Sequence, residues 1–388
     1  MGGDNIHKSH LYKKMKIIQI HNKYRYFGGE DSVVEEEARL LKSNNHEVIQ
    51  LIRNNSEELT SFNNKLKTFK NISYSNESIE ILNEKVSKFG LPDIVHIHNT
   101  FPLWTYSVLD FFKKKNIPII MTLHNYRLIW EKLGFLNKNR KNYGFFKDSN
   151  ILSYFISKLT NKRKDLLSYV TKFITHTEFT RQEFSTVILP IDKLIIKPNF
   201  LHSTSNTIKP IEDKKNVIFA SRISKEKGIL TLIKTFKNID IELDILGDGP
   251  LLSKIKKKDF KNIKFHGNLS RNQVSNFINK SKFLVFPSEW YESFPMTILE
   301  AFREGTLVLA SNIGSIKSII KDKYNGILFN SGDSFDLKKK IEWILANPKE
   351  CNKIVSNAYH EFNKKYSYET NYRQLIKIYE DAIKNYKN

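Results

Sequence analysis

The sequence of 388 residues is poor in the features that mark several large classes of protein. Its single cysteine, Cys351, excludes an internal disulfide framework and a cysteine-rich metal site, and suits a reducing compartment. No apolar run approaches the roughly 18 residues that a membrane-spanning helix needs. The first 14 residues are polar and do not resemble a secretory signal. We therefore expect a cytoplasmic protein.

Motifs that would assign some functions directly are also missing. Neither half of the chain opens with Gly-x-Gly-x-x-Gly, which argues against a dinucleotide oxidoreductase. There is no Asp-x-Asp pair to bind a divalent ion, so we expect neither a metal nor another bound cofactor. No repeat of roughly 20–50 residues is evident, which argues against a solenoid.

Acidic residues are outnumbered by basic ones, 41 Asp and Glu against 63 Lys and Arg, which gives a formal net charge of +22. A basic surface attracts polyanions such as nucleic acid, anionic lipid or phosphorylated substrates. Lysine is used heavily along the whole chain, however, so composition alone explains the total charge equally well. Only local clusters of charged residues can therefore indicate a binding site.

What the sequence does contain is an alternation of short β-rich runs with amphipathic helical stretches. The runs fall at residues 16–20, 46–52, 93–98, 117–123 and 172–175, and then at 216–220, 241–246, 263–266, 283–286, 307–310 and 326–329. After the first run, Ser32 and Glu35 fit the capping box of a helix over residues 32–43. This alternation predicts an α/β protein with two Rossmann-like domains, each a doubly wound parallel sheet.

A stretch with two prolines and little periodicity, residues 198–215, separates the two series of runs. We expect a polar extension at 1–14, a first domain at 15–200, a linker at 201–215, a second domain at 216–365 and a helix at 366–388 that crosses back onto the first domain. Ligands bind at the carboxyl ends of the strands in such sheets. The cleft between two facing domains is therefore the expected active site.

Glycines and basic residues gather where strands end and helices begin. Gly28 and Gly29 follow the first run, and paired glycines let the backbone approach an anion closely. Arg222 and Lys227 follow the first run of the second domain, where a guanidinium and an ammonium group suit phosphate. The alternatives are an ordinary tight turn in the first case and a solvated basic loop in the second.

The most specific element is Glu292-Ser-Phe-Pro-Met-Thr-Ile-Leu-Glu300. We expect a helix to begin near Phe294 or Pro295, with Glu292 just before it and Glu300 about two turns inside. A carboxylate beside a helix start can accept sugar hydroxyls, and the free N–H groups there can hold a diphosphate. Two glutamates at this spacing are common by chance. This element therefore indicates a function only in combination with the other motifs of the chain.

Taken in order, these elements resemble the family-four retaining glycosyltransferases, group 1 enzymes of the GT-B fold that build bacterial polysaccharides and lipid-linked glycans. The resemblance covers roughly residues 16 to 335. The matching pieces are Gly28-Gly29-Glu30-Asp31, Asp93-Ile-Val-His-Ile-His98, Thr122-Leu-His-Asn-Tyr-Arg127, Ser221-Arg222 with Lys227-Gly228, Gly247-Asp-Gly-Pro250, and Glu292 to Glu300 followed by Ala301 and Gly305.

The resemblance implies roles for particular residues. Arg222 and Lys227 would hold the donor diphosphate, and Glu300 would bind the ribose hydroxyls. Glu292 would face the transferred sugar, with His124 reaching the same reaction centre from the other domain. The remaining implied contacts are Leu269 around the base, the backbone N–H groups of Ser293, Phe294, Pro295 and Met296 at the phosphates, and Gly28 and Gly29 at donor phosphate or acceptor.

The resemblance also implies the reaction. A sugar would pass from a nucleotide-sugar, UDP-linked by default, to a glycan or lipid-linked acceptor with retention of configuration. Arg222, Lys227 and the helix start would stabilise the leaving diphosphate in place of a metal ion. A diphosphate oxygen would take the acceptor's proton, and a covalent adduct on Glu292 is the alternative. A nucleotide-sugar epimerase, a phosphorylase and a basic non-enzymatic binding module stay open as other interpretations.

Two places depart from the family's usual pattern. Lys317 and Ser318 stand where relatives often carry Pro-Glu, and Thr306 and Leu307 stand where Pro-Val is common. Neither departure removes a residue with an implied chemical role.

The stretch 127–172 holds eleven Lys or Arg against three acidic residues and is rich in aromatics. This mixture suits an anionic membrane face, and we expect peripheral association with the cytoplasmic leaflet. The alternative is an acceptor-side excursion whose aromatic residues form a core. Nucleic acid is the least favoured partner, because no nucleic-acid-binding module is recognisable.

Overall fold

The computed structural model describes residues 12–23, 28–129, 168–187, 189–203, 208–237, 239–256 and 260–387. Most of the stretch 127–172 lies outside these ranges, and the expected membrane-facing surface with it. None of the helices within them combines the length and the apolar character needed to cross a bilayer.

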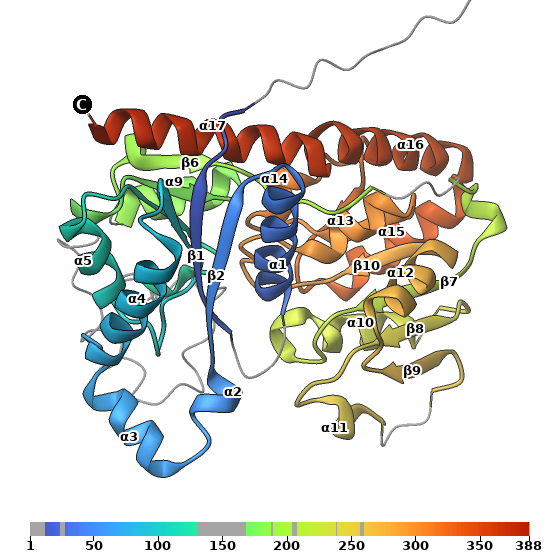
Figure 1. Ribbon diagram of the computed structural model, residues 1–388. Helices are drawn as coiled ribbons and strands as arrows, with labels where there is room; N and C mark the ends of the chain where they lie inside the picture. The colour runs from blue at the N-terminus through green and yellow to red at the C-terminus, as the bar shows by residue number, and fades with distance from the viewer. Residues whose placement is uncertain are drawn as a thin grey trace, which may run out of the picture. The chain divides into compact units, whose positions relative to one another are not determined.

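Two six-stranded sheets organise the chain (Figure 1). The first has the order β2-β1-β3-β4-β5-β6 and is built from β1 (Lys16–Lys23), β2 (Glu47–Asn54), β3 (Ile94–Ile97), β4 (Ile119–Thr122), β5 (Lys172–Thr175) and β6 (Leu194–Ile196). The second has the order β12-β11-β10-β7-β8-β9 and is built from β7 (Lys215–Ala220), β8 (Leu243–Leu246), β9 (Ile263–Gly267), β10 (Ser281–Phe286), β11 (Leu307–Ser311) and β12 (Ile327–Phe329). The strand pairings within the described ranges are parallel, so the predicted fold class is confirmed.

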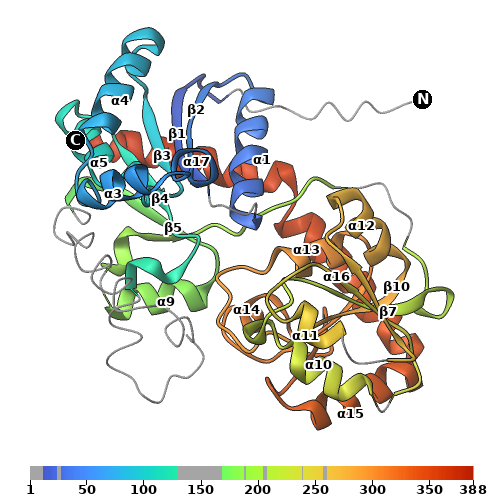
Figure 2. The same ribbon diagram turned by 90° about the horizontal axis from the view of Figure 1, so that it is seen from below.

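Alternate residues of the second sheet feed two separate cores. Val217 and Phe219 of β7 pack with α10 (Ile229–Phe236) and α15 (Ser334–Ala346). Ile218 and Ala220 of the same strand pack with α12 (Arg271–Lys280) and α13 (Met296–Arg303). Figure 2 shows these helix pairs on opposite sides of β7 and β10. A strand buried on both faces reads as a continuous apolar run, which is why these runs were recognisable in the sequence.

The strand order reverses between β7 and β10, and this reversal positions the site. The helix that follows β7 belongs to one core and the helix that follows β10 belongs to the other. The two connections therefore diverge at the carboxyl edge and leave room for a ligand between them.

The other helices in the described ranges are α1 (Gly29–Ser43), α2 (Asn55–Glu58), α3 (Phe62–Lys70), α4 (Asn76–Phe89), α5 (Ser107–Lys114), α9 (Glu178–Val187), α11 (Leu252–Lys256), α14 (Ile316–Ile319), α16 (Pro348–Lys365) and α17 (Tyr368–Lys387). Those up to α14 lie between strands, whereas α16 and α17 follow the last strand. Short 3₁₀ turns include η1 (Tyr126–Ile129), η4 (Ile191–Lys193), η5 (Ile211–Asp213) and η6 (Lys225–Lys227).

The chain divides into two compact units. Among described residues, the first unit contains those up to Thr122, residues 168–172 and those from Tyr372 onward. The second contains Leu123 to 129 and Phe173 to Asn371. His124 thus belongs to the same unit as Glu292.

Two local predictions were wrong. The first helix begins at Gly29 rather than Ser32, because the Asp31 carboxylate accepts the N–H of Gly28 at 2.8 Å and caps the helix three residues earlier. The strand β6 was not predicted at all. It has only three residues, Leu194–Ile196, and lies at the sheet edge, so its apolar run is too short to stand out.

His96 in β3 and His98 just after this strand form a buried network in the first unit. His96 Nδ1 lies 2.7 Å from the hydroxyl of Tyr379 in α17, and His96 Nε2 lies 2.7 Å from Thr122 Oγ1. The Glu37 carboxylate of α1 lies 2.9 Å from His96 and 3.4 Å from His98. Burial, reinforced by the neighbouring His96, lowers the pKa of His98 to about 3. His98 is therefore neutral in the folded protein at ordinary pH.

This depressed pKa predicts a loss of stability in mild acid. In the unfolded chain His98 takes up a proton near its ordinary pKa of about 6.5, whereas in the folded chain it stays neutral down to about pH 3. The unfolded state then binds more protons, so this residue should remove about 2 kcal/mol of unfolding free energy between pH 7 and pH 5. Urea unfolding at both pH values measures the loss.

The variant His98→Gln should show a pH dependence smaller by about that amount, because glutamine does not titrate. His360→Gln, at an exposed position of α16, is the matched control and should leave the dependence of the wild type unchanged. Equal pH slopes in wild type and His98→Gln would contradict the assignment.

Candidate active site

The second-unit residues to which the sequence assigned roles meet at the carboxyl edge of the second sheet. Arg222 and Lys227 lie just beyond β7, and Leu269 lies just beyond β9. Glu292 lies in the loop between β10 and α13, and Glu300 is the fifth residue of α13. These loops flank the reversal of strand order, where ligands bind in doubly wound sheets.

Glycines bring these loops into direct backbone contact. Gly228 ends η6 in the left-handed conformation, with φ of 71°, and a Cβ atom there would lie 1.8 Å from the carbonyl oxygen of Pro287. The backbone N–H of Glu289 donates to the carbonyl of Glu226 at 2.9 Å. The loop that carries Lys227 is therefore packed against the loop that carries Glu292, at a distance that only glycine permits.

The Gly247-Asp-Gly element has the same purpose on the other side of Arg222. A Cβ atom at Gly247 would lie 2.2 Å from the carbonyl oxygen of Ser221, and one at Gly249 would lie 2.4 Å from that of Ile223. The end of β8 thus presses on the loop that carries Arg222. The family resemblance implies no role for this element, and in the structure it supports the loop that carries Arg222.

Lys227 and Glu292 form an ion pair, with Nζ 2.7 Å from Oε1. The hydroxyl of Ser288 donates to the same carboxylate oxygen at 2.8 Å. The two charged side chains are only 23% and 13% exposed, so each charge depends on the other in the absence of a ligand. The structure places the expected diphosphate-binding cation and the expected sugar-facing carboxylate side by side.

Arg222 differs from Lys227 because its side chain is exposed. No described carboxylate forms an ion pair with it. A guanidinium that is not committed to a protein partner can offer its fork of N–H donors to an anion.

The start of α13 supplies further donors. The helix begins at Met296 with Pro295 as its N-cap, within two residues of the predicted start. Among described groups, the backbone N–H groups of Ser293, Phe294 and Met296 have no acceptor, as is usual ahead of and within a first turn. Pro295 has no N–H, so its expected donation to phosphate was wrong.

Glu300 lies about one turn inside α13, closer to the helix start than predicted, and is partly exposed. Burial raises the pKa of its carboxyl group, against the opposing charges of Arg303 and Arg271. Within the described chain, no side chain or backbone group forms a hydrogen bond or ion pair with this carboxylate. Such a group is suited to accept hydrogen bonds from ligand hydroxyls.

His124 is the second residue after β4 and is buried, with 8% of its surface exposed. Its Nδ1 lies 3.4 Å from His176 Nε2, and His176 Nδ1 lies 3.1 Å from the carbonyl oxygen of Lys197. Because a carbonyl only accepts, His176 carries its proton on Nδ1 and accepts from His124 Nδ1–H when both rings are neutral. This hydrogen-bond chain assigns the lone pair of neutral His124 to Nε2.

Two contacts tie the His124 loop to the Glu292 loop. The Ser293 hydroxyl donates to the backbone oxygen of His124, and the Tyr126 hydroxyl donates to the backbone oxygen of Glu292 at 3.3 Å. Burial raises the pKa of Tyr126, which keeps this hydroxyl a neutral donor. Sequence reasoning assigned no role to Tyr126 or His176, because only the folded backbone brings them to this loop.

Comparison with known proteins decides the class of the enzyme. Residues 204–361 match the family model described as glycosyl transferases group 1, and residues 27–202 match the model described as glycosyltransferase family 4. Together the two models account for most of the chain. The chain belongs to this glycosyltransferase family. Its recognition as a GT-B glycosyltransferase and as an enzyme of this class is thereby confirmed.

Individual relatives agree with this assignment. The transferase is 27% identical to an uncharacterised glycosyltransferase of Methanocaldococcus jannaschii over an alignment of 379 residues. This alignment covers 95% of this chain and 98% of that protein. It is 26% identical over 177 residues, 43% of this chain and 48% of that protein, to a Campylobacter jejuni α-1,4-N-acetyl-D-galactosaminyltransferase named for a glycan on PP-undecaprenol. The crystal structure of Anabaena HepE with UDP and glucose superposes with a TM-score of 0.69 at 14% identity, over 95% of this chain and 100% of HepE.

The first unit of the transferase carries the two glycines that were expected at phosphate or acceptor. Gly28 is the N-cap of α1 and has an extended backbone, with φ of −133°. A Cβ atom there would meet only Asp31 Oδ2, at 3.9 Å. The fold itself does not require glycine at position 28, so its suggested use in backbone approach to a ligand stays a prediction.

The departure at Thr306 and Leu307 has a structural explanation. The Thr306 hydroxyl donates to the carbonyl of Ile278 at 2.7 Å and accepts from Lys214 Nζ at 2.9 Å. Leu307 begins β11 and is buried in the core with α10. The threonine thus provides a hydrogen-bond acceptor for a buried lysine. The departure from Pro-Val leaves the connection from α13 to β11 in place.

Gly228 offers a direct test of the backbone contact that builds the site. We expect Gly228→Ala to lower the unfolding free energy by about 1–2 kcal/mol for the left-handed conformation. Displacement of the Pro287 carbonyl should cost about 1–3 kcal/mol more. Gly267→Ala is the matched control, because Gly267 has φ of 70° but nothing within 4 Å of its Cβ position. Chemical unfolding measures both variants. An equal loss of unfolding free energy in Gly228→Ala and Gly267→Ala would show that the contact with Pro287 contributes nothing.

Proposed function

We propose that the transferase moves a sugar from a nucleoside-diphosphate sugar, UDP-linked by preference, to a glycan or lipid-linked glycan acceptor with retention of configuration. The observation that carries the proposal is the composition of one sheet edge. Arg222, Lys227 and the amides ahead of α13 provide positive charge and donors, while Glu292 and Glu300 provide carboxylates for hydroxyl groups. HepE, which was solved with UDP and glucose, and the Campylobacter relative, which is named for a PP-undecaprenol-linked glycan, support the choice of donor and acceptor.

In the proposed reaction the bond between the anomeric carbon and the diphosphate oxygen breaks, and the acceptor oxygen forms its new bond on the same face of the sugar. Negative charge grows on the departing diphosphate, which Arg222, Lys227 and the N–H groups of Ser293, Phe294 and Met296 would stabilise. The acceptor's proton passes to a diphosphate oxygen. A covalent adduct on Glu292 is the alternative route to the same stereochemistry.

The Lys227–Glu292 pair has a specific consequence for donor binding. A diphosphate that contacts Lys227 shares this cation with Glu292, which is already held by Ser288. Glu292 then stays beside the sugar, where it can stabilise the positive charge that develops on the anomeric carbon. His124 would contact the same sugar, oriented by His176.

The diphosphate assignment predicts the effect of removing each cation. Loss of a charge-assisted contact costs about 1.5–3 kcal/mol, so Arg222→Ala should weaken UDP binding by roughly 10- to 150-fold in calorimetry. Lys227→Ala should weaken it more, because Glu292 then repels the diphosphate. The double variant Lys227→Ala/Glu292→Gln should recover part of the loss.

The control for these variants is Lys234→Ala, at an exposed position of α10 away from the strand-end loops. Its UDP affinity should equal that of the wild type. Wild-type affinity in both Arg222→Ala and Lys227→Ala would overturn the assignment. Arg222→Lys should bind with intermediate affinity, since it keeps the charge and loses the fork of donors.

We also propose that no divalent metal takes part, because cationic side chains and a helix start occupy the metal's role and the sequence has no Asp-x-Asp pair. Acceptor glycosylation should therefore continue at the same rate in excess EDTA. Chromatography of the glycosylated acceptor, with and without added magnesium or manganese, measures the rate. Activity that is lost in EDTA and restored by either ion would overturn the proposal.

A further inference from the structure

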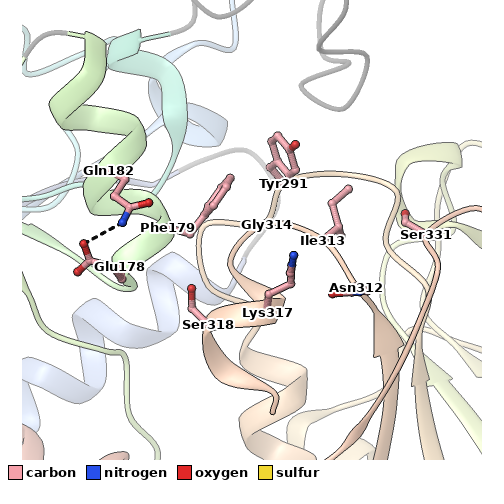
Figure 3. A pocket seen from close by; sticks show the side chains of 10 residues that line it. All are labelled: Glu178, Phe179, Gln182, Tyr291, Asn312, Ile313, Gly314, Lys317, Ser318 and Ser331. Atoms are coloured by element: carbon pink, nitrogen blue, oxygen red, sulfur yellow. Dashed lines mark hydrogen bonds between the residues drawn. The ribbon is translucent and has the colours of Figure 1, made fainter. Parts of the chain in front are cut away.

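A cavity of about 490 Å³ lies in the second unit beside the Glu292 loop (Figure 3). Its size falls within the range of pockets that hold small ligands. Asn312 follows the end of β11 directly, and Ser331 follows the end of β12, so the cavity lies at the carboxyl edge of the sheet. Tyr291, which lines it, is the residue before Glu292. The cavity therefore lies next to the loop that carries Glu292.

Two aromatic rings form one wall of this cavity. The Phe179 and Tyr291 rings lie 5.0 Å apart between centroids, inclined by 60°. A Cβ atom at Gly314 would lie 2.7 Å from Tyr291 Cδ1, so the backbone of the loop after β11 supports the tyrosine ring from behind. Aromatic faces carry partial negative charge and attract the weakly positive C–H groups of a sugar ring.

Lys317 is the cation of the cavity. It is exposed and forms no ion pair within the described part of the chain. The other charged residue of the lining, Glu178, is already engaged, since its carboxylate lies 3.4 Å from Arg181 and 3.3 Å from Gln182. The lining therefore offers a positive charge without a compensating negative one, together with amide and hydroxyl groups that can bind sugar hydroxyls.

We infer that this cavity is an acceptor subsite that binds a sugar ring bearing an anionic substituent, a carboxylate or a phosphate. The ring lies against Phe179 and Tyr291, and the anion contacts Lys317. The inference rests on the proposed function, because it assigns the cavity to the acceptor side of the same transfer. The donor diphosphate binds elsewhere, at Arg222 and Lys227 in the loop that follows β7.

Direct binding to the full chain tests the subsite. Ligand-detected NMR titrations with D-glucuronate, D-glucose 1-phosphate and methyl glucoside compare a carboxylate, a phosphate and a neutral sugar. At least one of the anionic sugars should bind at least about tenfold more tightly than methyl glucoside. The anion that binds more tightly identifies the substituent. Equal binding of all three sugars, or of none, would overturn the inference.

Two lysine variants locate the binding. Lys317→Met should lose at least about tenfold in affinity for the anionic sugar and leave methyl glucoside unchanged. Lys321→Met is the matched control, because Lys321 is also exposed and lies just beyond α14 outside the lining, and its affinities should equal those of the wild type. Wild-type affinity in Lys317→Met would overturn the inference.

Glucose 1-phosphate could also occupy the diphosphate site, so Arg222→Ala is titrated in parallel. Binding that falls in Arg222→Ala and persists in Lys317→Met would assign the phosphate to the donor site and overturn its placement in the cavity. UDP affinity, measured on the same samples, separates the two proposals. A wild type that binds UDP but neither anionic sugar refutes the subsite alone, whereas a wild type that does not bind UDP refutes the proposed function.

Discussion

The candidate site depends on close approach between backbones at the carboxyl edge of the second sheet. At Gly228, Gly247 and Gly249 a single methyl group would collide with a carbonyl group of a neighbouring loop. Loops from β7, β8 and β10 are therefore fixed against one another before any side chain makes a contact. Arg222, Lys227 and Glu292 project from this framework, so their separation is set by main-chain geometry. A site built in this way is preorganised, which is the condition for stabilising charge as it develops.

Charge within the framework is balanced unevenly. Lys227 and Glu292 form a largely buried ion pair. The side chains of Arg222 and Glu300 form no ion pair within the described residues, so both can bind a ligand. The paired residues are those proposed to lie nearest the breaking bond, where misplaced charge costs most. Arg222 and Glu300, which form no ion pair or side-chain hydrogen bond among the described residues, are those proposed to bind the diphosphate and the ribose, where the ligand itself supplies the counter-charge or the hydroxyl groups.

The sequence predicted what local pattern controls. Continuous apolar runs marked eleven of the strands, because a parallel strand buried on both faces has few polar positions. The cation positions after β7 and the glutamates around α13 could be located because each adjoins such a run. The helix start at Ser32 was wrong because Ser32 and Glu35 fit a capping-box pattern, whereas in the structure the Asp31 carboxylate accepts the N–H of Gly28. The strand β6 was too short to carry a pattern.

What the sequence could not supply were contacts between distant segments. His176 contacts His124 across 52 residues of sequence, and Tyr126 contacts Glu292 across 166, separations that no spacing rule covers. Each was visible only as an ordinary polar residue after a strand. The cavity at Lys317 combines residues from α9 and from the loops after β10, β11 and β12. The departure from the family pattern at Lys317 and Ser318 did not by itself indicate a cavity.

The contact between His96 and Tyr379 has a consequence for the way the protein is made. Tyr379 lies in α17, which is synthesised after every strand of both sheets, yet its hydroxyl meets a histidine of β3 that emerged from the ribosome long before. Domains generally fold as units as they emerge, the amino-terminal one first. Until α17 has been translated, the His96 ring lacks this hydroxyl and has only Glu37 and Thr122 as partners among the residues described above. The contacts of the amino-terminal unit are therefore complete only after the last helix of the chain has been made.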